Sequence, residues 1–183
     1  QNRLQDIMLP EAQKIVDKLT ALLGRNRVIL DTQFHMRPGD RFFYHLQRGV
    51  PLRLELGEAE MSSSCLRAVR RDTAEVLNIS FDAVEREVPK LLDEIQRSLF
   101  ERAKAFRESN TYQVSSFDEF KEVLNKKGGF IKAYFAGTPE DERAIKEATT
   151  ATVRCFLLDD SSEGTCFYTK KPGGRLAIFA KAY

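Results

Sequence analysis

The chain has 183 residues, of which 42% are hydrophobic and 31% are charged, and its formal net charge is +2. A chain of this length forms one large domain or two small ones. The small net charge excludes a uniformly basic nucleic-acid-coating protein, and no run of 18 apolar residues exists for a membrane-spanning helix. Three cysteines, Cys65, Cys155 and Cys166, lack the spacing of a disulfide framework, so we expect a reducing, cytoplasmic setting.

The first 31 residues predict a helix followed by a short strand. Residues 9–23 place Ile15, Leu19 and Leu22 on one apolar stripe, and Gly24 ends the helix. The apolar run at 28–30 is typical of a buried strand. The N-terminal sequence is not a signal peptide and does not start with Met. We therefore expect that the chain starts inside a longer protein or was processed.

Residues 38–57 predict a turn, a short helix and a strand. Pro38 and Gly39 start the turn, and Phe42 and Leu46 recur at helical spacing up to Gly49, which is suited to a left-handed helix end. After it, leucines at 52, 54 and 56 alternate with charged residues, which indicates a strand with one buried face.

Cationic side chains are spread through this unit. Arg37, Arg41 and Arg48 lie on it, together with His35 and His45. Guanidinium groups on a rigid frame suit phosphates and base edges, which favours a nucleic-acid contact. The alternative, from composition alone, is a solvated surface without a ligand.

The next elements are a strand over 63–70 and a long helix over 81–108. Ser80 is a suitable N-cap residue for that helix, and Pro89 is expected to kink it or to divide it in two. Its apolar face continues from Val84 to Phe106.

A domain boundary is expected at 110–116, and a second α+β pattern follows it. Ser116 and Thr138 are predicted N-caps of two helices, and strands are expected over 129–135, 152–158, 166–169 and 176–180. Strands that alternate with helices indicate α/β or α+β folds. The expected core of this part consists of Phe130, Ile131, Phe135, Ile145, Val153, Phe156, Ile178 and Phe179.

Four segments together resemble one family. Residues 38–57, the run Val-Arg-Arg-Asp-Thr at 69–73, residues 148–155 and the terminal Phe-Ala-Lys-Ala-Tyr resemble prolyl-tRNA synthetases of the archaeal/eukaryotic type, which are class II aminoacyl-tRNA synthetases. The resemblance covers nearly the whole chain. It implies an α/β fold: a mixed-sheet anticodon-binding domain at 1–112, which lacks its first strand, and a small α+β domain at 113–183.

The resemblance also implies a function and partners. The parent enzyme attaches proline to tRNA(Pro) with ATP and magnesium and is a homodimer, and this segment would recognise the anticodon while the catalytic domain lies elsewhere in the same enzyme. No catalytic constellation is recognisable in this chain. The implied tRNA-binding residues are Asp31, Gln33, Arg37, Arg41, Tyr44 and Arg48.

Two of these residues depart from the family pattern. Gln33 stands where the family has Arg, and Tyr44 stands where it has Glu. These changes leave open a second hypothesis, in which the chain is a non-catalytic interaction module that has lost tRNA recognition.

The resemblance also leads to expectations about a zinc site and about the C-terminal residue. The four zinc-ligand positions of the family align with Ala136, Asp141, Cys166 and Thr169, and one strong thiolate ligand cannot replace a tetrahedral set, so we expect no zinc. The resemblance places the terminal Tyr183 against the rest of the enzyme, near its active site.

Overall fold

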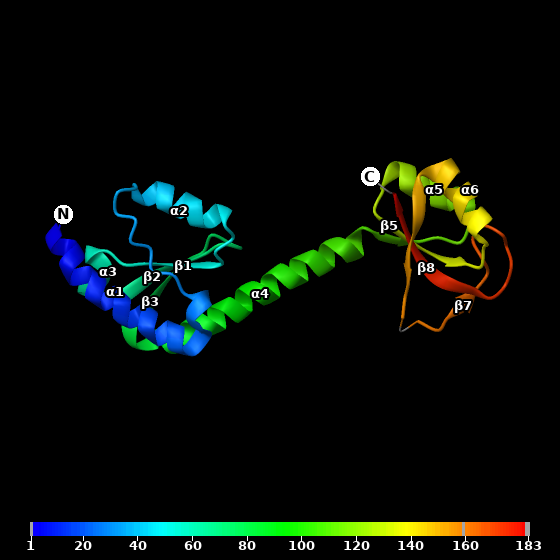
Figure 1. Cartoon of the computed structure of the whole chain (residues 1–183). Helices are drawn as coiled ribbons and strands as arrows, with labels where there is room; N and C mark the ends of the chain where they lie inside the picture. Colours follow the sequence, from blue (N-terminus) through cyan, green and yellow to red (C-terminus); the bar gives the residue numbers. More distant parts are fainter. Residues whose placement is uncertain (1, 159, 182–183) are drawn as a thin grey trace. The chain divides into compact units, whose positions relative to one another are not determined.

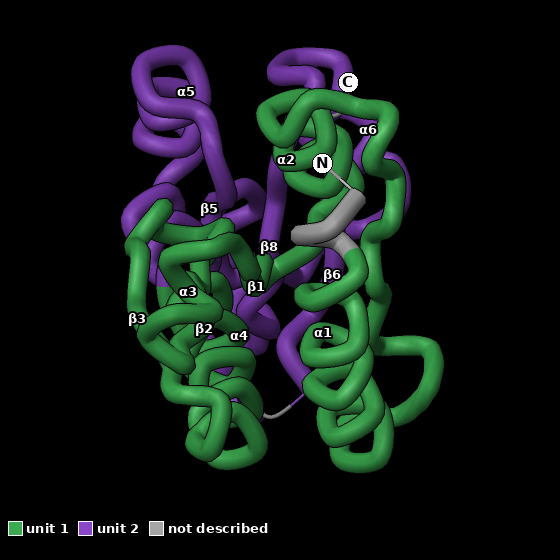
Figure 2. Tube along the Cα trace, turned by 90° about the vertical axis from the view of Figure 1, so that its left-hand side faces the viewer, with its two compact units in different colours: residues 1–101 green, residues 102–183 purple. Residues whose placement is uncertain are grey.

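A computed structural model describes residues 2–158 and 160–181 of the chain. The chain divides into two compact units, residues 1–101 and 102–183, which Figure 2 distinguishes by colour. The division falls within one long helix, whereas the sequence-based boundary at 112/113 stays a prediction. Within the described ranges, no helix combines the length and the apolar composition needed to cross a membrane.

The first unit contains a three-stranded antiparallel sheet with two long helices against it (Figure 1). Its elements, in order, are α1 (Asn2–Leu23), η1 (Arg25–Arg27), α2 (Pro38–Gln47), β1 (Leu52–Glu55), α3 (Glu58–Ser63), β2 (Cys65–Arg70), β3 (Val76–Ser80), η2 (Phe81–Ala83) and α4 (Val84–Ser109). The strand order is β1-β2-β3, with Leu52 opposite Arg70 and Leu66 opposite Ile79.

One face of this sheet carries the core of the unit. Alternation along β2 turns Leu66 and Ala68 inward, where they pack with Ile15 and Leu19 of α1 and with the first half of α4. The leucines at 52, 54 and 56 are partly buried against the same cluster, as their alternation predicts.

Several local predictions in this unit were wrong. Residues 28–30 form no strand, because they lie outside the three-stranded sheet, and Ile29 is 73% exposed. The Ser80 side chain makes no capping hydrogen bond, since a short 3-10 turn precedes α4. Of the two alternatives for Pro89, a kink or a division, the division is excluded, because α4 is continuous over Val84–Ser109 and is held on the core by Val84 and Val88. The short elements α3 and β3 were not foreseen.

The second unit is a mixed sheet covered by two helices (Figure 1). Its elements are β4 (Thr111–Gln113), α5 (Phe117–Lys126), β5 (Phe130–Phe135), α6 (Pro139–Thr149), β6 (Ala151–Phe156), β7 (Glu163–Gly164) and β8 (Gly174–Lys181). The strand order is β4-β5-β8-β6, with β7 also paired to β8, and β4 runs parallel to β5. Residues 111–113, expected at the domain boundary, therefore form an edge strand of this sheet.

Aromatic rings fill the core of the second unit. Ile131, Ile145 and Phe179 are fully buried as predicted, and Phe167 joins them with its ring centroid 4.8 Å from that of Phe120. Phe130 and Phe156 were wrongly placed in the core, because they are 41% and 39% exposed.

The predicted strand over 166–169 is a turn. The Lys170 N–H donates to the Cys166 carbonyl at 3.0 Å, and the Cys166 N–H donates to the Lys171 carbonyl at 2.8 Å. Both predicted N-caps are confirmed: Ser116 accepts a hydrogen bond from the Glu119 N–H, and Thr138 accepts one from the Asp141 N–H.

Candidate nucleic-acid interface

Helix α2 is the frame of the candidate site. Pro38 stands in its first turn and Asp40 adds a favourable charge there, while Arg37 is the N-cap residue. At the other end Gly49 has φ 77°, the left-handed conformation expected from the sequence. The helix therefore has fixed ends and presents its cationic and aromatic side chains from a rigid base.

Asp31 connects the preceding loop to α2. Its Oδ2 accepts a hydrogen bond from Arg41 Nε at 3.0 Å and lies 2.9 Å from His45 Nε2, while its Oδ1 accepts from the Gln33 N–H at 2.9 Å. Arg41 also donates through Nη2 to the Asp31 carbonyl at 2.8 Å. The two contacts from one guanidinium fix the loop against the helix.

The charge of Asp31 is strongly stabilised by these contacts. Burial would raise the pKa of this carboxyl, but the hydrogen bonds from the Gln33 N–H, Arg41 and His45 outweigh it and lower the pKa to about 2. Asp31 is thus ionised at neutral pH, and its oxygens are already engaged by groups of the chain itself.

Arginine and aromatic side chains pair on and beside α2. The Arg48 guanidinium carbon lies 3.7 Å from the centroid of the Tyr44 ring, and that of Arg41 lies 5.6 Å from the Phe34 ring. Phe34, Tyr44 and Arg48 are all exposed. Planar groups that stack on one another and face solvent suit unstacked nucleic-acid bases.

A third pair lies under the same helix. The Arg53 guanidinium carbon is 4.1 Å from the Phe42 ring centroid, and Arg53 Nε also donates to Glu55 at 2.7 Å. Because both partners are partly buried and Glu55 neutralises the cation, this pair fastens α2 to β1.

The structure brings five of the six candidate residues into two groups: Asp31, Gln33 and Arg41 in one, and Tyr44 and Arg48 in the other. The sixth, Arg37, is exposed at the start of α2. We call Phe34, Arg37, Arg41, Tyr44 and Arg48 the α2 surface.

Two members of this neighbourhood were missed by the sequence reading. His45 was named only among the cationic side chains of this unit and not as a site residue, yet it shares Asp31 with Arg41. The i, i+4 spacing of 41 and 45 on a helix was the available signal. Nothing in the sequence singles out Phe34, whose role depends on where its loop lies. His35, by contrast, is exposed.

The residues at the four aligned zinc positions take part in other hydrogen bonds of the fold. Asp141 Oδ2 accepts from the Thr138 N–H at 2.8 Å in the capping box of α6. Burial would raise the pKa of the Cys166 thiol, but hydrogen bonds from the Ala136 N–H and from Thr169 lower it overall. Among the described residues, no three His, Cys, Asp or Glu side chains are grouped so that they could hold a metal ion.

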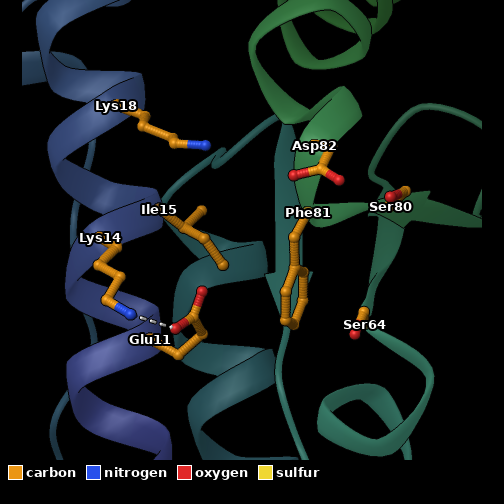
Figure 3. A pocket seen from close by; sticks show the side chains of 8 residues that line it. All are labelled: Glu11, Lys14, Ile15, Lys18, Ser64, Ser80, Phe81 and Asp82. Atoms are coloured by element: carbon orange, nitrogen blue, oxygen red, sulfur yellow. Dashed lines mark hydrogen bonds and ion pairs between the residues drawn. The ribbon is translucent and has the colours of Figure 1, made fainter.

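A hollow between α1 and the β3–α4 connection is a less suitable site (Figure 3). Lys14 and Lys18 line it, but Lys14 Nζ lies 2.8 Å from Glu11 Oε2 and Lys18 Nζ lies 3.8 Å from Glu85 Oε2. Asp82 adds another acid. The cations are thus neutralised locally, and the hollow offers no charge preference for a ligand.

Comparisons with known proteins agree with this geometry. The sequence matches the anticodon binding domain over residues 3–91, and the C-terminal domain of prolyl-tRNA synthetase over residues 117–183. The fold and the family match therefore define an anticodon-binding domain, and the α/β fold class expected from the sequence is confirmed.

Curated relatives make the assignment specific. The proline-tRNA ligase of Phocaeicola vulgatus is 40% identical over 177 residues, which are 94% of this chain and 35% of that protein. The proline-tRNA ligase of Amoebophilus asiaticus is 40% identical over 155 residues, 84% of this chain and 32% of that protein. The chain belongs to the prolyl-tRNA synthetase family, and it spans about a third of the length of these relatives.

A solved structure gives the same answer for the fold. Giardia lamblia prolyl-tRNA synthetase in complex with prolyl-adenylate matches with a TM-score of 0.85 at 28% sequence identity. The match covers 100% of this chain and 39% of that one.

Proposed function

We propose that this chain is the anticodon-binding, C-terminal part of a proline-tRNA ligase and that it binds tRNA(Pro) through the α2 surface. The observation that carries the proposal is the stacking of exposed Arg48 on the exposed Tyr44 ring at the end of α2, with Arg41 beside the exposed Phe34 ring of the preceding loop. Anticodon bases are single-stranded, and proteins read such bases by stacking and by hydrogen bonds to their edges.

The contacts of Tyr44, Arg48 and Arg41 support a role for each in binding RNA. Arg48, stacked on Tyr44, offers the outer face of its guanidinium to a base and its N–H groups to a base edge or a phosphate. Arg41 is held by Asp31, so it reaches RNA from a fixed position. Asp31 is a positioning residue in this scheme, because its oxygens are engaged by Arg41, His45 and Gln33.

The proposal extends to the complete enzyme. It would join proline to tRNA(Pro) with ATP and magnesium in a catalytic domain outside this sequence, as a cytoplasmic homodimer. The curated relatives are proline-tRNA ligases, and the Giardia enzyme was solved with prolyl-adenylate, the product of the ATP-dependent step.

The α2 surface is tested by binding of the 183-residue chain to a proline tRNA transcript. Arg41→Ala and Arg48→Ala are each expected to weaken binding by about tenfold, because each removes one stacked or phosphate-contacting cation. The salt dependence of binding should also become less steep. Arg86→Ala is the matched control, since Arg86 is an exposed arginine of α4 paired with Glu87.

Unchanged affinity and an unchanged salt slope in both variants would move the site elsewhere. If the wild-type chain also binds the proline tRNA no better than an unrelated tRNA, the result would favour the second candidate function. In that function the chain is an interaction module that has lost tRNA recognition. One observation favours that candidate, namely that the chain's own groups already engage the Asp31 carboxylate and one face of Tyr44.

Tyr183 lies outside the described residues, and its role near the active site remains a proposal from the resemblance. Deletion of residues 182 and 183 from the complete ligase is expected to reduce aminoacylation more than tRNA affinity. Full activity of the truncated ligase would contradict this role.

A further inference from the structure

The two consecutive arginines at the end of β2 turn to different parts of the first unit. Arg70 is buried, and its Nη2 lies 2.9 Å from Asp72 Oδ2. Arg71 is exposed, and its Nε donates a hydrogen bond to the Leu46 carbonyl of α2 at 3.2 Å. Because successive side chains of an extended chain point to opposite faces, the second arginine reaches the helix that carries most of the α2 surface.

The Leu46 carbonyl lies at the C-terminal end of α2. It also accepts a hydrogen bond from the Gly49 N–H at 3.1 Å, and this contact closes the turn that contains Arg48. The Arg71 N–H donates to the Pro51 carbonyl at 2.9 Å, just after the same turn. The last carbonyls of a helix form its negative end and favour a cation there. Backbone and side chain together therefore hold Arg71 at the helix end that carries Arg48.

The charge of Arg71 is not neutralised within the described part of the chain. No carboxylate of the described residues lies within ion-pair distance of Arg71 or Arg48, whereas Arg53 and Arg67 share the acid Glu55. The two terminal nitrogens of Arg71 likewise have no acceptor among these residues. Two uncompensated guanidinium groups at one helix end attract a polyanion, and the terminal N–H groups of arginine match the oxygens of a phosphate.

We propose that Arg71 is a further tRNA-binding residue, whose terminal N–H groups contact a backbone phosphate beside the base that stacks at Arg48. This inference rests on the proposed function. A phosphate suits Arg71 better than a base, because no aromatic ring of the described residues pairs with it, in contrast to Arg48 on Tyr44. Phosphate contacts position the RNA and do not depend on its sequence. Arg71 therefore raises the affinity, while the α2 surface selects the anticodon.

Binding of two transcripts over a range of salt concentrations tests this assignment. The 183-residue chain and its variants are titrated with a proline tRNA transcript and with the same transcript carrying a replaced anticodon. The variants are Arg71→Ala, Arg71→Lys and Arg48→Ala. Arg97→Ala is the matched control, since Arg97 is an exposed arginine of α4 in the same unit. Urea denaturation checks that each variant is folded.

Arg71→Ala is expected to weaken the binding of both transcripts by the same factor, about fivefold, because a phosphate contact is independent of sequence. The slope of log Kd against log salt should fall by about 0.7 to 1. Arg71→Lys keeps the charge and should retain most of the slope. Arg48→Ala should instead reduce the preference for the proline anticodon, and Arg97→Ala should bind as the wild type does.

A purely structural role for Arg71, as a tether of α2, predicts another pattern, because a displaced helix loses the preference between the transcripts. A reduced preference in Arg71→Ala, an unchanged salt slope, or an Arg71→Lys protein as weak as Arg71→Ala would overturn the proposal. If Arg48→Ala loses the preference while Arg71→Ala behaves as the wild type, the phosphate contact is wrong and the proposed function stands. A wild-type chain that binds both transcripts equally overturns the proposed function and this inference with it.

Discussion

At the scale of single residues, Asp31 has the most consequential contacts of the candidate site. It joins Arg41, His45 and the Gln33 backbone, and all three keep its carboxylate charged. Replacing the carboxylate by an amide leaves one neutral oxygen where Arg41, His45 and the Gln33 N–H now share two charged ones, so at least one partly buried hydrogen bond is lost or weakened.

Asp31→Asn is therefore expected to lower the free energy of unfolding by about 1–3 kcal/mol. It should also weaken tRNA binding, because Arg41 loses its fixed position. Urea denaturation and RNA titration measure the two effects. Asp40→Asn is the control, since Asp40 is an exposed acid in the first turn of the same helix. An Asp31→Asn protein as stable as the control would contradict the positioning role.

The sequence predicted some of these residues for reasons that the structure explains. Arg41, Tyr44 and Arg48 could be proposed because a capped helix fixes their spacing. Phe34 and the link from His45 to Asp31 could not, since both depend on how an irregular loop returns to the helix. The secondary-structure propensities of single residues contain no information about the path of that loop.

At the scale of elements, the hairpin between β2 and β3 contains a buried ion pair, and its arginine also contacts an acid of α4. Arg70 Nη2 lies 2.9 Å from Asp72 Oδ2 and its Nη1 lies 3.5 Å from Glu94 Oε2 of α4, while Asp72 is almost fully buried. A buried pair is costly to break, because Arg70 then keeps only its longer contacts with the more exposed acids Glu75 and Glu94.

Asp72→Asn is expected to reduce the free energy of unfolding by about 3 kcal/mol. Chemical denaturation checks the value. Glu87→Gln is the control, since it removes one member of the exposed pair between Arg86 and Glu87, and it should leave stability unchanged. Equal effects of the two substitutions on the free energy of unfolding would contradict a larger contribution of the buried Arg70–Asp72 pair to stability.

The N-cap of α6 makes a smaller contribution. Thr138 Oγ1 accepts from the Asp141 N–H at 3.3 Å, and Asp141 Oδ2 accepts from the Thr138 N–H at 2.8 Å. Thr138→Ala should cost about 1 kcal/mol. Thr138→Ser keeps the hydroxyl and should restore most of it in the same denaturation assay; a serine variant as unstable as the alanine variant would contradict the capping role.

Caps and strands were predictable where the signal is local. At the start of α6, all the groups that form the capping box lie within the four residues Thr-Pro-Glu-Asp. The turn over 166–171 was mistaken for a strand, because burial of Phe167 against Phe120 and Phe179 comes from tertiary packing. The segment at 28–30 failed for the opposite reason: an apolar run becomes a strand only beside a neighbouring strand.

At the scale of the whole molecule, acid stability should depend on two carboxylates, the buried Asp72 and the partly buried Asp31. Hydrogen bonds from Arg70, set against burial, lower the pKa of Asp72 to about 2, and the pKa of Asp31 is lowered to about 2 from an ordinary value of 3.8. A lowered folded-state pKa stabilises the fold above the unfolded value, so this stabilisation is full above pH 4 and is lost as the pH falls toward 2.

The melting temperature should therefore fall steeply between pH 4 and pH 2, and Asp72→Asn should flatten that dependence. Thermal melts at a series of pH values measure both. An Asp72→Asn protein with the same slope as the wild type would contradict the assignment of acid sensitivity to this pair.

The central claim is that this chain binds tRNA(Pro) by its anticodon, and one comparison tests it most directly. The dissociation constant of the 183-residue chain is measured for a proline tRNA transcript and for the same transcript with its anticodon replaced, at one fixed salt concentration. The account predicts at least tenfold weaker binding of the altered transcript, a difference of about 1.4 kcal/mol. Equal affinities for the two transcripts would contradict it.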